Sequence, residues 1–386
     1  MNTNNTQNCL VASYPNRGVA FENGEGNYLY DQNGDKFLDL GSNYGVNIFG
    51  YNHPAITAAL DEQLRRLINL HGSFNSGVRM QAAKALVERC GGKLSRVFFS
   101  NSGAEAIEGA LKFARLATGK SHFVAMKGSY HGKTLGALSA TSGDKYRDSF
   151  QPLLWDFTHV PFGDKSVFLS SITNATAAII LEPIQGEGGV VPAPQGFLEF
   201  IQKICREKEI LLIVDEIQTG LGRTGTFLAG ELYGLTPDIL CLGKGLAGGI
   251  PVGATLVSES ISQKIPLHLH TSTFGGNPLV CAGIIAVLNE FNNENLLNHI
   301  KVMGDYFLSQ LKQLKSLKIK DVRGIGLMLA IELHENSTQI LKALQLEKII
   351  AIPAGSNVVR FLPPYLITKK EIDLAIHILQ RIFEKI

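Results

Sequence analysis

The feature that most constrains the fold is a pair of unbroken apolar runs joined by a helical segment. Residues 177–181 (Ala-Ala-Ile-Ile-Leu) and 210–214 (Ile-Leu-Leu-Ile-Val) contain no polar side chain. Such runs are typical of central parallel strands that helices cover on both faces. The segment between them, residues 196–209, has the length of a crossover helix. The pattern therefore predicts a βαβ unit and an α/β fold with a largely parallel sheet.

Three other segments give local predictions. Residues 97–100 read as a buried strand, and residues 104–117 as a helix. Asn33-Gly34, between two apolar/polar alternations, predicts a β-hairpin over residues 28–38. Residues 368–371 (Thr-Lys-Lys-Glu) form a capping-box pattern that opens a final helix. The apolar face of the first helix would carry Ile107, Ala110, Leu111 and Ala114. The apolar face of the final helix would carry Ile372, Ala375, Ile376, Leu379 and Phe383.

A change in the pattern of strands and helices along the chain predicts two domains. Strands alternate with helices up to about residue 285, and longer helical stretches follow. We expect a large α/β domain at residues 50–285 and a small C-terminal domain at residues 286–386. Residues 1–49, with the hairpin, would join the small domain. A chain of 386 residues is long enough for this arrangement.

Composition excludes several classes of protein. Hydrophobic residues make up 45% and charged residues 18% of the chain, and the net charge is +2, which argues against disorder and against nucleic-acid binding. Neither a signal peptide nor an apolar run of roughly 20 residues is present, so we expect a cytoplasmic protein without a membrane partner. The five widely spaced cysteines indicate neither a disulfide framework nor a metal site.

Two side chains suit cofactor chemistry. Asp215 follows the run 210–214, at a strand end where open α/β sheets bind ligands, although a single Asp there can also cap a turn. Lys244 lies between Gly243 and Gly245 in an apolar stretch. Burial of an ammonium is unfavourable unless its charge is paired or lost, and an imine removes that charge. The flanking glycines would leave room for a bulky group, while a mobile surface loop would explain the same pattern.

A third segment suits a phosphate. Ser102, Gly103 and Ala104 stand where a strand turns into a helix, whose N-terminus presents free N–H groups and a positive dipole end. An ordinary Ser N-cap gives the same sequence. None of the three segments is decisive by itself.

Together, in this order and spacing, the three segments resemble the class III pyridoxal-phosphate aminotransferases. Further matching motifs span nearly the whole chain and lie at residues 128–134 (GSYHGKT), 181–189 (LEPIQGEGG), 271–278 (TSTFGGNP) and 359–364 (VRFLPP). The resemblance implies fold type I, with a large, mostly parallel domain and a smaller α+β domain. It also implies pyridoxal 5'-phosphate as the cofactor.

The resemblance assigns roles to individual residues. Lys244 would hold the cofactor as an imine and move protons, and Asp215 would pair with the pyridinium nitrogen. Thr273 would reach the phosphate of a neighbouring subunit, so a homodimer, or a tetramer of two dimers, is expected. The other cofactor-binding residues would be Ser102, Gly103 and Ala104 at the phosphate, Tyr130 and Ile217 on the two ring faces, Gln218 at the ring hydroxyl, and His131 and Glu182.

Four further residues would select the substrates. Glu187 and Arg360 match a pair that several ω-aminotransferases use as a switch, although a structural ion pair is the alternative. Arg360 would bind the keto acid carboxylate, and Glu187 would neutralise Arg360 while the amine donor is bound. Lys133 stands where acetylornithine and ornithine enzymes usually carry an arginine that grips a carboxylate, and lysine lacks the bidentate fork. Tyr44 would touch a carboxylate of the donor or belong to the core.

The donor itself is left open between two types. Residues 353–363 look like the acetylornithine type, whereas residues 159–163 and 237–242, and Lys133, look like the putrescine type. We expect N-acetylornithine or ornithine to pass its terminal amino group to 2-oxoglutarate, giving a semialdehyde and glutamate. The alternatives are putrescine or another ω-amine, such as 4-aminobutyrate or diaminobutyrate, and an aminomutase reaction that needs no external keto acid.

Overall fold

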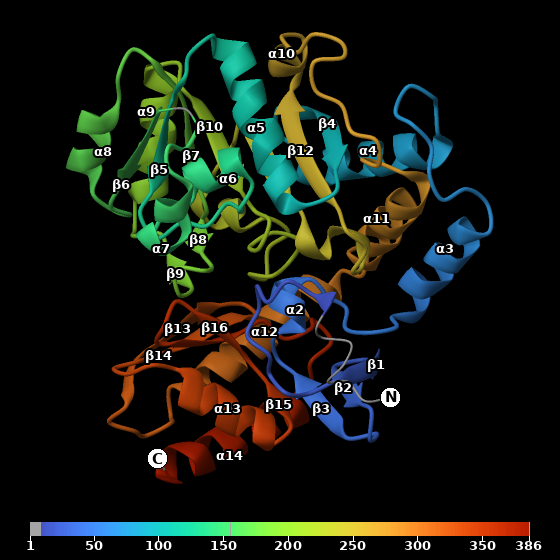
Figure 1. The fold of residues 1–386 in the computed structure, drawn as a ribbon, viewed down its shortest axis with the longest axis vertical. Helices are drawn as coiled ribbons and strands as arrows, with labels where there is room; N and C mark the ends of the chain where they lie inside the picture. Colours follow the sequence, from blue (N-terminus) through green and yellow to red (C-terminus); the bar gives the residue numbers. More distant parts are fainter. Residues whose placement is uncertain (1–8, 155, 386) are drawn as a thin grey trace.

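The protein has two lobes, which the computed structural model describes over residues 9–154 and 156–385. In Figure 1 the lobe with the large sheet lies above, and the lobe formed by the two ends of the chain lies below. No helix in these two ranges is long and apolar enough to cross a membrane. The same ranges contain no group of three or more His, Cys, Asp or Glu residues that could hold a metal ion.

Among the described residues, the upper lobe is built on a seven-stranded sheet. Its strands, in spatial order, are β4 (Leu94–Ser100), β12 (Gly253–Ser258), β11 (Ile239–Leu242), β10 (Leu211–Asp215), β7 (Thr176–Leu181), β5 (His122–Met126) and β6 (Asp156–Val160). Neighbours from β11 to β6 are parallel, whereas β12 is antiparallel to both β11 and β4. The prediction of a mostly parallel sheet is confirmed. The strand predicted at 97–100 exists within β4, but β4 is an edge strand, so Val97 and Phe98 are only partly buried.

Helices cover both faces of this sheet, which explains its apolar strands. In β10, Ile213 packs in the same cluster as α5 (Gly103–Thr118), while Leu212 and Val214 pack in the cluster that contains α9 (Phe197–Glu207). Each fully buried Leu or Ile contributes roughly 1.5–3 kcal/mol. The helices predicted at residues 104–117 and 196–209 are confirmed as α5 and α9. The other helices of this lobe are α3 (Pro54–Leu64), α4 (Gly77–Cys90), α6 (Leu135–Ala140), α7 (Asp144–Arg147), α8 (Lys165–Ser171), α10 (Glu259–Ser262) and α11 (Pro278–Glu290).

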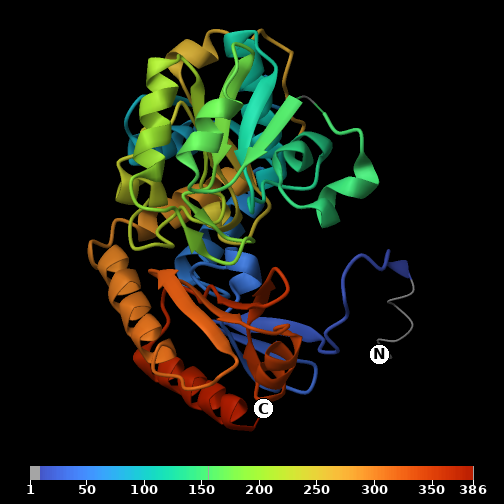
Figure 2. The same ribbon diagram turned by 90° about the vertical axis from the view of Figure 1, so that its left-hand side faces the viewer.

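The lower lobe contains an antiparallel sheet that helices cover on one side. Its strands run in the order β13 (Ile319–Ile325), β14 (Met328–Leu333), β17 (Val358–Phe361) and β16 (Ile352–Ala354). Figure 2 shows α12 (Asn295–Leu311) and α14 (Lys369–Lys385) along one side of the sheet, and α13 (Thr338–Leu346) lies beside α14. The predicted capping box opens α14, where Thr368 and Glu371 exchange hydrogen bonds. Ile376 is only partly buried, and the buried face includes Ile378 and Ile382 instead.

The N-terminal hairpin pairs with this part of the chain. Strands β1 (Phe21–Glu25), β2 (Tyr28–Asp31) and β3 (Lys36–Asp39) are antiparallel, which confirms the predicted hairpin, and β3 runs parallel to β15 (Ile349–Ile350). Backbone bonds from Leu38 to Lys348 and from Leu40 to Ile350 join the two ends of the chain. The domain boundaries near residues 49 and 285 stay a prediction.

Candidate functional site

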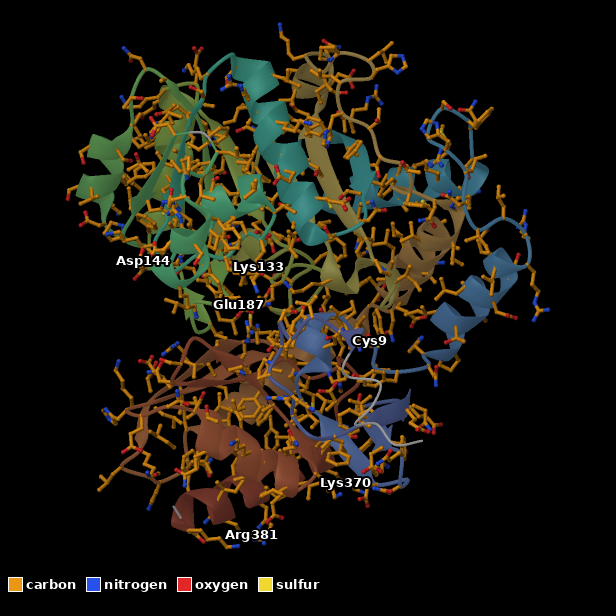
Figure 3. The ribbon with its side chains drawn as sticks, viewed as in Figure 1. Cys9, Lys133, Asp144, Glu187, Lys370 and Arg381 are labelled. Atoms are coloured by element: carbon orange, nitrogen blue, oxygen red, sulfur yellow. The ribbon has the colours of Figure 1, made fainter. Side chains whose placement is uncertain are left out.

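Segments of the chain that follow strand ends meet at a cavity of about 480 Å³. Its lining contains every residue predicted to bind the cofactor except Ser102 and Thr273. The residues that line it are Gly103, Ala104, Tyr130, His131, Gly132, Lys133, Thr134, Glu182, Glu187, Asp215, Ile217, Gln218 and Lys244. Figure 3 places Lys133 and Glu187 on the side of the upper lobe that faces the lower lobe. The cavity therefore opens near the junction of the lobes.

Lys244 begins a 3-10 turn, Lys244–Ala247, directly beyond β11. Its φ of 48° is a left-handed conformation that lysine rarely adopts. Lys244 is partly accessible because it lines the cavity. The protein around its ammonium nevertheless excludes most water, and this burial lowers the pKa of the ammonium. The prediction that both flanking glycines leave room for a bulky group is wrong for Gly245 and stays a prediction for Gly243. A Cβ on Gly245 would lie 2.6 Å from Ile48, so this glycine serves close packing rather than access to the amine.

A buried polar network holds Asp215, the last residue of β10. Its Oδ2 lies 2.7 Å from His131 Nδ1, and its Oδ1 accepts a hydrogen bond from the Ile217 N–H at 3.0 Å. Glu182, also buried, accepts from the Tyr130 N–H at 3.0 Å and the Gly186 N–H at 3.2 Å. Burial raises the pKa of the Glu182 carboxyl. These bonds fix the Asp215 carboxylate and the segment that carries Tyr130.

The predicted phosphate site lies at the N-terminus of α5. Ser102 is the N-cap, and its Oγ accepts from the Glu105 N–H at 3.2 Å, as in an ordinary N-cap. Gly103 and Ala104 follow it and line the cavity. A Cβ on Gly103 would lie 2.9 Å from Ile217 Cγ2, so only glycine allows the helix to approach the Asp215–Gln218 segment this closely.

Arg360 of β17 reaches the cavity rim from the lower lobe. It is fully buried, and its Nη2 donates to Glu187 Oε1 at 2.6 Å while its Nη1 donates to Gln218 Oε1 at 2.8 Å. Pro353 O accepts a further bond from Nη2 at 3.2 Å. The structure thus brings Arg360, Glu187 and Gln218 together, although Gln218 and Arg360 are 142 positions apart.

Tyr44 lies beside Arg360 rather than in the core. The centre of its ring is 5.5 Å from the guanidinium carbon, and the residue is 41% exposed, so the core-packing alternative is wrong. Tyr44 stands in a left-handed turn, α2 (Ser42–Gly45), in which Asn43 has a φ of 49° and Tyr44 a φ of 60°.

Two predicted residues have few contacts with the others. Lys133 is exposed at the cavity mouth, and its Nζ lies 5.7 Å from the centre of the Tyr146 ring. Thr273 is exposed in a loop that does not line the cavity. The sequence interpretation also missed Gly132 and Thr134, which line the cavity on either side of Lys133. Both belong to the 128–134 motif, and this membership could have predicted their place at the cavity.

The groups around the cavity fit pyridoxal phosphate. The N-terminus of α5 suits a phosphate, the Asp215 carboxylate suits a protonated ring nitrogen, and the Lys244 amine suits an aldehyde. Tyr130 and Ile217 supply an aromatic and an aliphatic surface on the same cavity. Burial raises the pKa of Tyr130 to about 12, so its hydroxyl stays protonated.

Comparisons with known proteins identify proteins that this chain resembles over nearly its whole length. The family profile described as aminotransferase class-III matches residues 11–383. An acetylornithine aminotransferase of Aquifex aeolicus is 42% identical over 97% of this chain and 99% of its own length. Another, from Methanothermobacter thermautotrophicus, is 39% identical over 96% of this chain and 95% of its own length. The crystal structure of an ornithine aminotransferase from Toxoplasma gondii is 31% identical, with a TM-score of 0.95 over 99% of this chain and 94% of that chain.

Proposed function

This chain belongs to the aminotransferase class-III family, and we propose that it transfers the terminal amino group of N-acetylornithine or ornithine to 2-oxoglutarate. It is a pyridoxal-phosphate-dependent transaminase. The products of the proposed reaction are a semialdehyde and glutamate. The observation that carries the proposal is the 2.6 Å pair of Glu187 and Arg360 beside the cavity that contains Lys244. The names of the similar acetylornithine enzymes support the choice of donor.

The Glu187–Arg360 pair suits two unlike substrates. Arg360 is fully buried, so its charge needs a partner at every stage of the reaction. The Glu187 side chain is 23% exposed and can turn toward solvent. While the donor amine is bound, Glu187 would neutralise Arg360. When 2-oxoglutarate enters, its carboxylate would replace Glu187 and accept two parallel bonds from the guanidinium.

The residues around the cavity would hold the cofactor in a fixed orientation. When bound, pyridoxal phosphate supplies an aldehyde that condenses with amines and a ring that withdraws electrons from the reacting carbon. Ser102, Gly103 and Ala104 would hold the phosphate. Asp215, fixed by His131, would keep a proton on the ring nitrogen. The two ring faces would contact Tyr130 and Ile217, and Gln218 would approach the ring hydroxyl from its place beside Arg360.

Lys244 would both hold the aldehyde carbon and move protons. Burial lowers the pKa of its amine, which increases the neutral fraction that can attack a carbonyl or accept a proton. After a donor amine displaces it, the free Lys244 amine would take the proton from the donor carbon. Glu182, held by two backbone N–H groups, would keep Tyr130 in place during these steps.

A second candidate donor is putrescine or another ω-amine. Lys133 favours it, because an exposed ammonium at the cavity mouth lacks the fork with which arginine grips a carboxylate. A diamine has no carboxylate to bind there. An aminomutase reaction is disfavoured by the Glu187–Arg360 pair, because its proposed switching role requires a keto acid.

A panel of donors tests these alternatives. Purified holoenzyme is incubated with 2-oxoglutarate and N-acetylornithine, ornithine, putrescine or 4-aminobutyrate, and glutamate formation gives kcat/KM for each donor. We expect N-acetylornithine or ornithine to give the highest value. A higher value for putrescine would make putrescine the donor. Consumption of a donor without any keto acid, measured on the donor itself, would support the aminomutase.

We also propose that two copies of the chain share their active sites. The loop 271–276, which carries Thr273, is joined to the segment 70–76 by Arg79, which donates to Gly276 O at 2.6 Å and to Phe74 O at 2.9 Å. A hollow of about 760 Å³ between α3, α4 and α11 adjoins this segment. Four large apolar residues on or close to this segment are exposed, as is common at surfaces that associate: Leu67, Ile68, Phe74 and Met80.

Sedimentation of the holoenzyme tests the shared site. We expect the mass of a dimer or tetramer, and Thr273→Ala is expected to weaken cofactor binding without changing that mass. A monomer with full activity would contradict the proposal.

A further inference from the structure

The turn that carries Glu187 is a strained hairpin. Strands β8 (Ile184–Gln185) and β9 (Val191–Pro192) flank residues 186–190, the Glu187 turn, and Figure 1 shows them projecting toward the lower lobe. Val190 is buried and has a φ of 56°, a conformation that β-branched residues rarely adopt. Gly189 has a φ of 111°. Such a turn persists only where surrounding contacts hold it.

Arg323 of β13 provides those contacts from the lower lobe. Its Nε donates to Gly189 O at 3.0 Å and to Val190 O at 3.1 Å, and its Nη2 donates to Gly189 O at 2.7 Å. A Cβ on Gly189 would lie 3.0 Å from Arg323 Nη2, so glycine permits the close approach. The guanidinium therefore holds the backbone of the turn two and three residues beyond Glu187.

Two carboxylates fix the other end of the same guanidinium. Arg323 Nη1 donates to Asp321 Oδ2 at 2.8 Å and to Glu332 Oε2 at 2.5 Å, and Lys320 also bonds Glu332 at 2.6 Å. The bond from Lys320, with those from Arg323, lowers the pKa of Glu332. Because its charge is already neutralised, Arg323 acts on the cavity by fixing the turn and adds little electric field.

We propose that Arg323 is a positioning residue that holds the Glu187 turn so that Glu187 can return to Arg360 after each keto acid leaves. This inference rests on the proposed role of Glu187 in neutralising Arg360. With the backbone fixed, Glu187 moves by side-chain rotation alone, and its carboxylate returns to the same place, 2.6 Å from Arg360. With the backbone free, the turn can relax away from the lower lobe, and Arg360 loses its partner while the donor is bound.

The two half-reactions should respond differently. The donor half-reaction needs Glu187 on Arg360, whereas the keto acid half-reaction needs Glu187 displaced. Arg323→Gln removes the fork and is expected to lower kcat/KM for the donor about tenfold, the effect of one lost charge-assisted hydrogen bond. For 2-oxoglutarate kcat/KM should stay level or rise. A residue that merely stabilised the fold would lower both values together.

The half-reactions are measured separately by single-turnover absorbance of the holoenzyme, with the donor alone and then with 2-oxoglutarate alone. Arg323→Lys keeps the charge and loses the two-pronged guanidinium, so it should give an intermediate effect. It also keeps the test usable if the glutamine variant folds poorly. Lys318→Gln is the matched control, because Lys318 precedes β13 and bonds the exposed Glu335 instead of the turn. It should change neither half-reaction.

Glu187→Gln separates this inference from the proposed function. If Glu187→Gln leaves the ratio of the two half-reactions unchanged, the role of Glu187 is wrong. If Glu187→Gln changes the ratio and Arg323→Gln does not, the role of Arg323 is wrong. In the double variant, Arg323→Gln should add nothing to the ratio, because there is no charge left to position. Independent, additive effects would overturn the inference.

Discussion

Arg360→Met removes the proposed carboxylate-binding group while keeping an apolar side chain of useful length. In the structure, Arg360 makes bonds of 2.6 Å and 2.8 Å to Glu187 and Gln218 from its two terminal nitrogens. A keto acid carboxylate would take up bonds of the same kind. Two charge-assisted bonds at about 1.5–3 kcal/mol each correspond to a loss of at least a hundredfold in kcat/KM for 2-oxoglutarate.

The donor half-reaction should be affected much less. An ω-amine presents no carboxylate to Arg360, so kcat/KM for the donor is expected to fall by no more than about fivefold, roughly 1 kcal/mol. Removing one partner of a buried ion pair destabilises a fold mainly by leaving the other charge buried and unpaired, so the fold should survive when that other partner can reach water. Glu187 can do so, since its side chain is 23% exposed.

Single-turnover kinetics with each substrate tests this prediction, and thermal unfolding monitors the fold. Arg381→Met is the matched control, because Arg381 forms an exposed 3.3 Å pair with Glu347 far from the cavity. A fall of less than about threefold for 2-oxoglutarate, under 1 kcal/mol, would refute the assignment of Arg360. Equal losses in both half-reactions would point to a structural ion pair.

Three further predictions concern single side chains. Lys133→Arg should raise kcat/KM for N-acetylornithine relative to putrescine about tenfold. An unchanged ratio would show that Lys133 does not bind the donor. Asp215→Asn should slow proton removal from the donor by at least about a hundredfold while the cofactor still binds, as its absorbance would report. Burial, with Arg147 nearby, lowers the pKa of His159 to about 4. The unfolded chain therefore binds the extra proton between about pH 6.5 and 4, and stability should fall over this range as pH falls, by up to roughly 3 kcal/mol. Urea unfolding of His159→Gln should show a flatter pH dependence.

Local pattern was enough to predict the βαβ unit and several element ends. The run 210–214 is apolar at every position because helices cover both faces of β10, and the capping box at Thr368 depends only on residues within one helical turn. The antiparallel direction of β12 was not predictable. All of its residues are buried, so its sequence pattern is the same for either direction.

The candidate site was predictable where a motif follows a strand, as at Asp215 and Lys244. Contacts between the lobes were not predictable from local pattern, and the Glu187–Arg360 pair was expected only from the resemblance to a family. Arg323 stands in a strand whose charged residues suggest a solvent-facing surface, and its partner Gly189 is 134 positions away. Gly245 looked like an opening for a ligand, yet Ile48 from the N-terminal segment occupies the space next to it. Only the folded chain brings these residues together.

The left-handed backbone at Lys244 means that the side chain proposed for catalysis lowers the stability of the fold. Glycine would adopt a φ of 48° without strain, whereas any residue with a Cβ is destabilised there by about 1–2 kcal/mol. The proposed role of Lys244 requires an amine at this position, so the chain carries a residue that the backbone disfavours. Without cofactor, Lys244→Gly should therefore unfold at a higher temperature than Lys244→Ala, although neither variant has an amine. Searches for more stable variants of this enzyme will tend to select against the side chain on which the proposed chemistry depends.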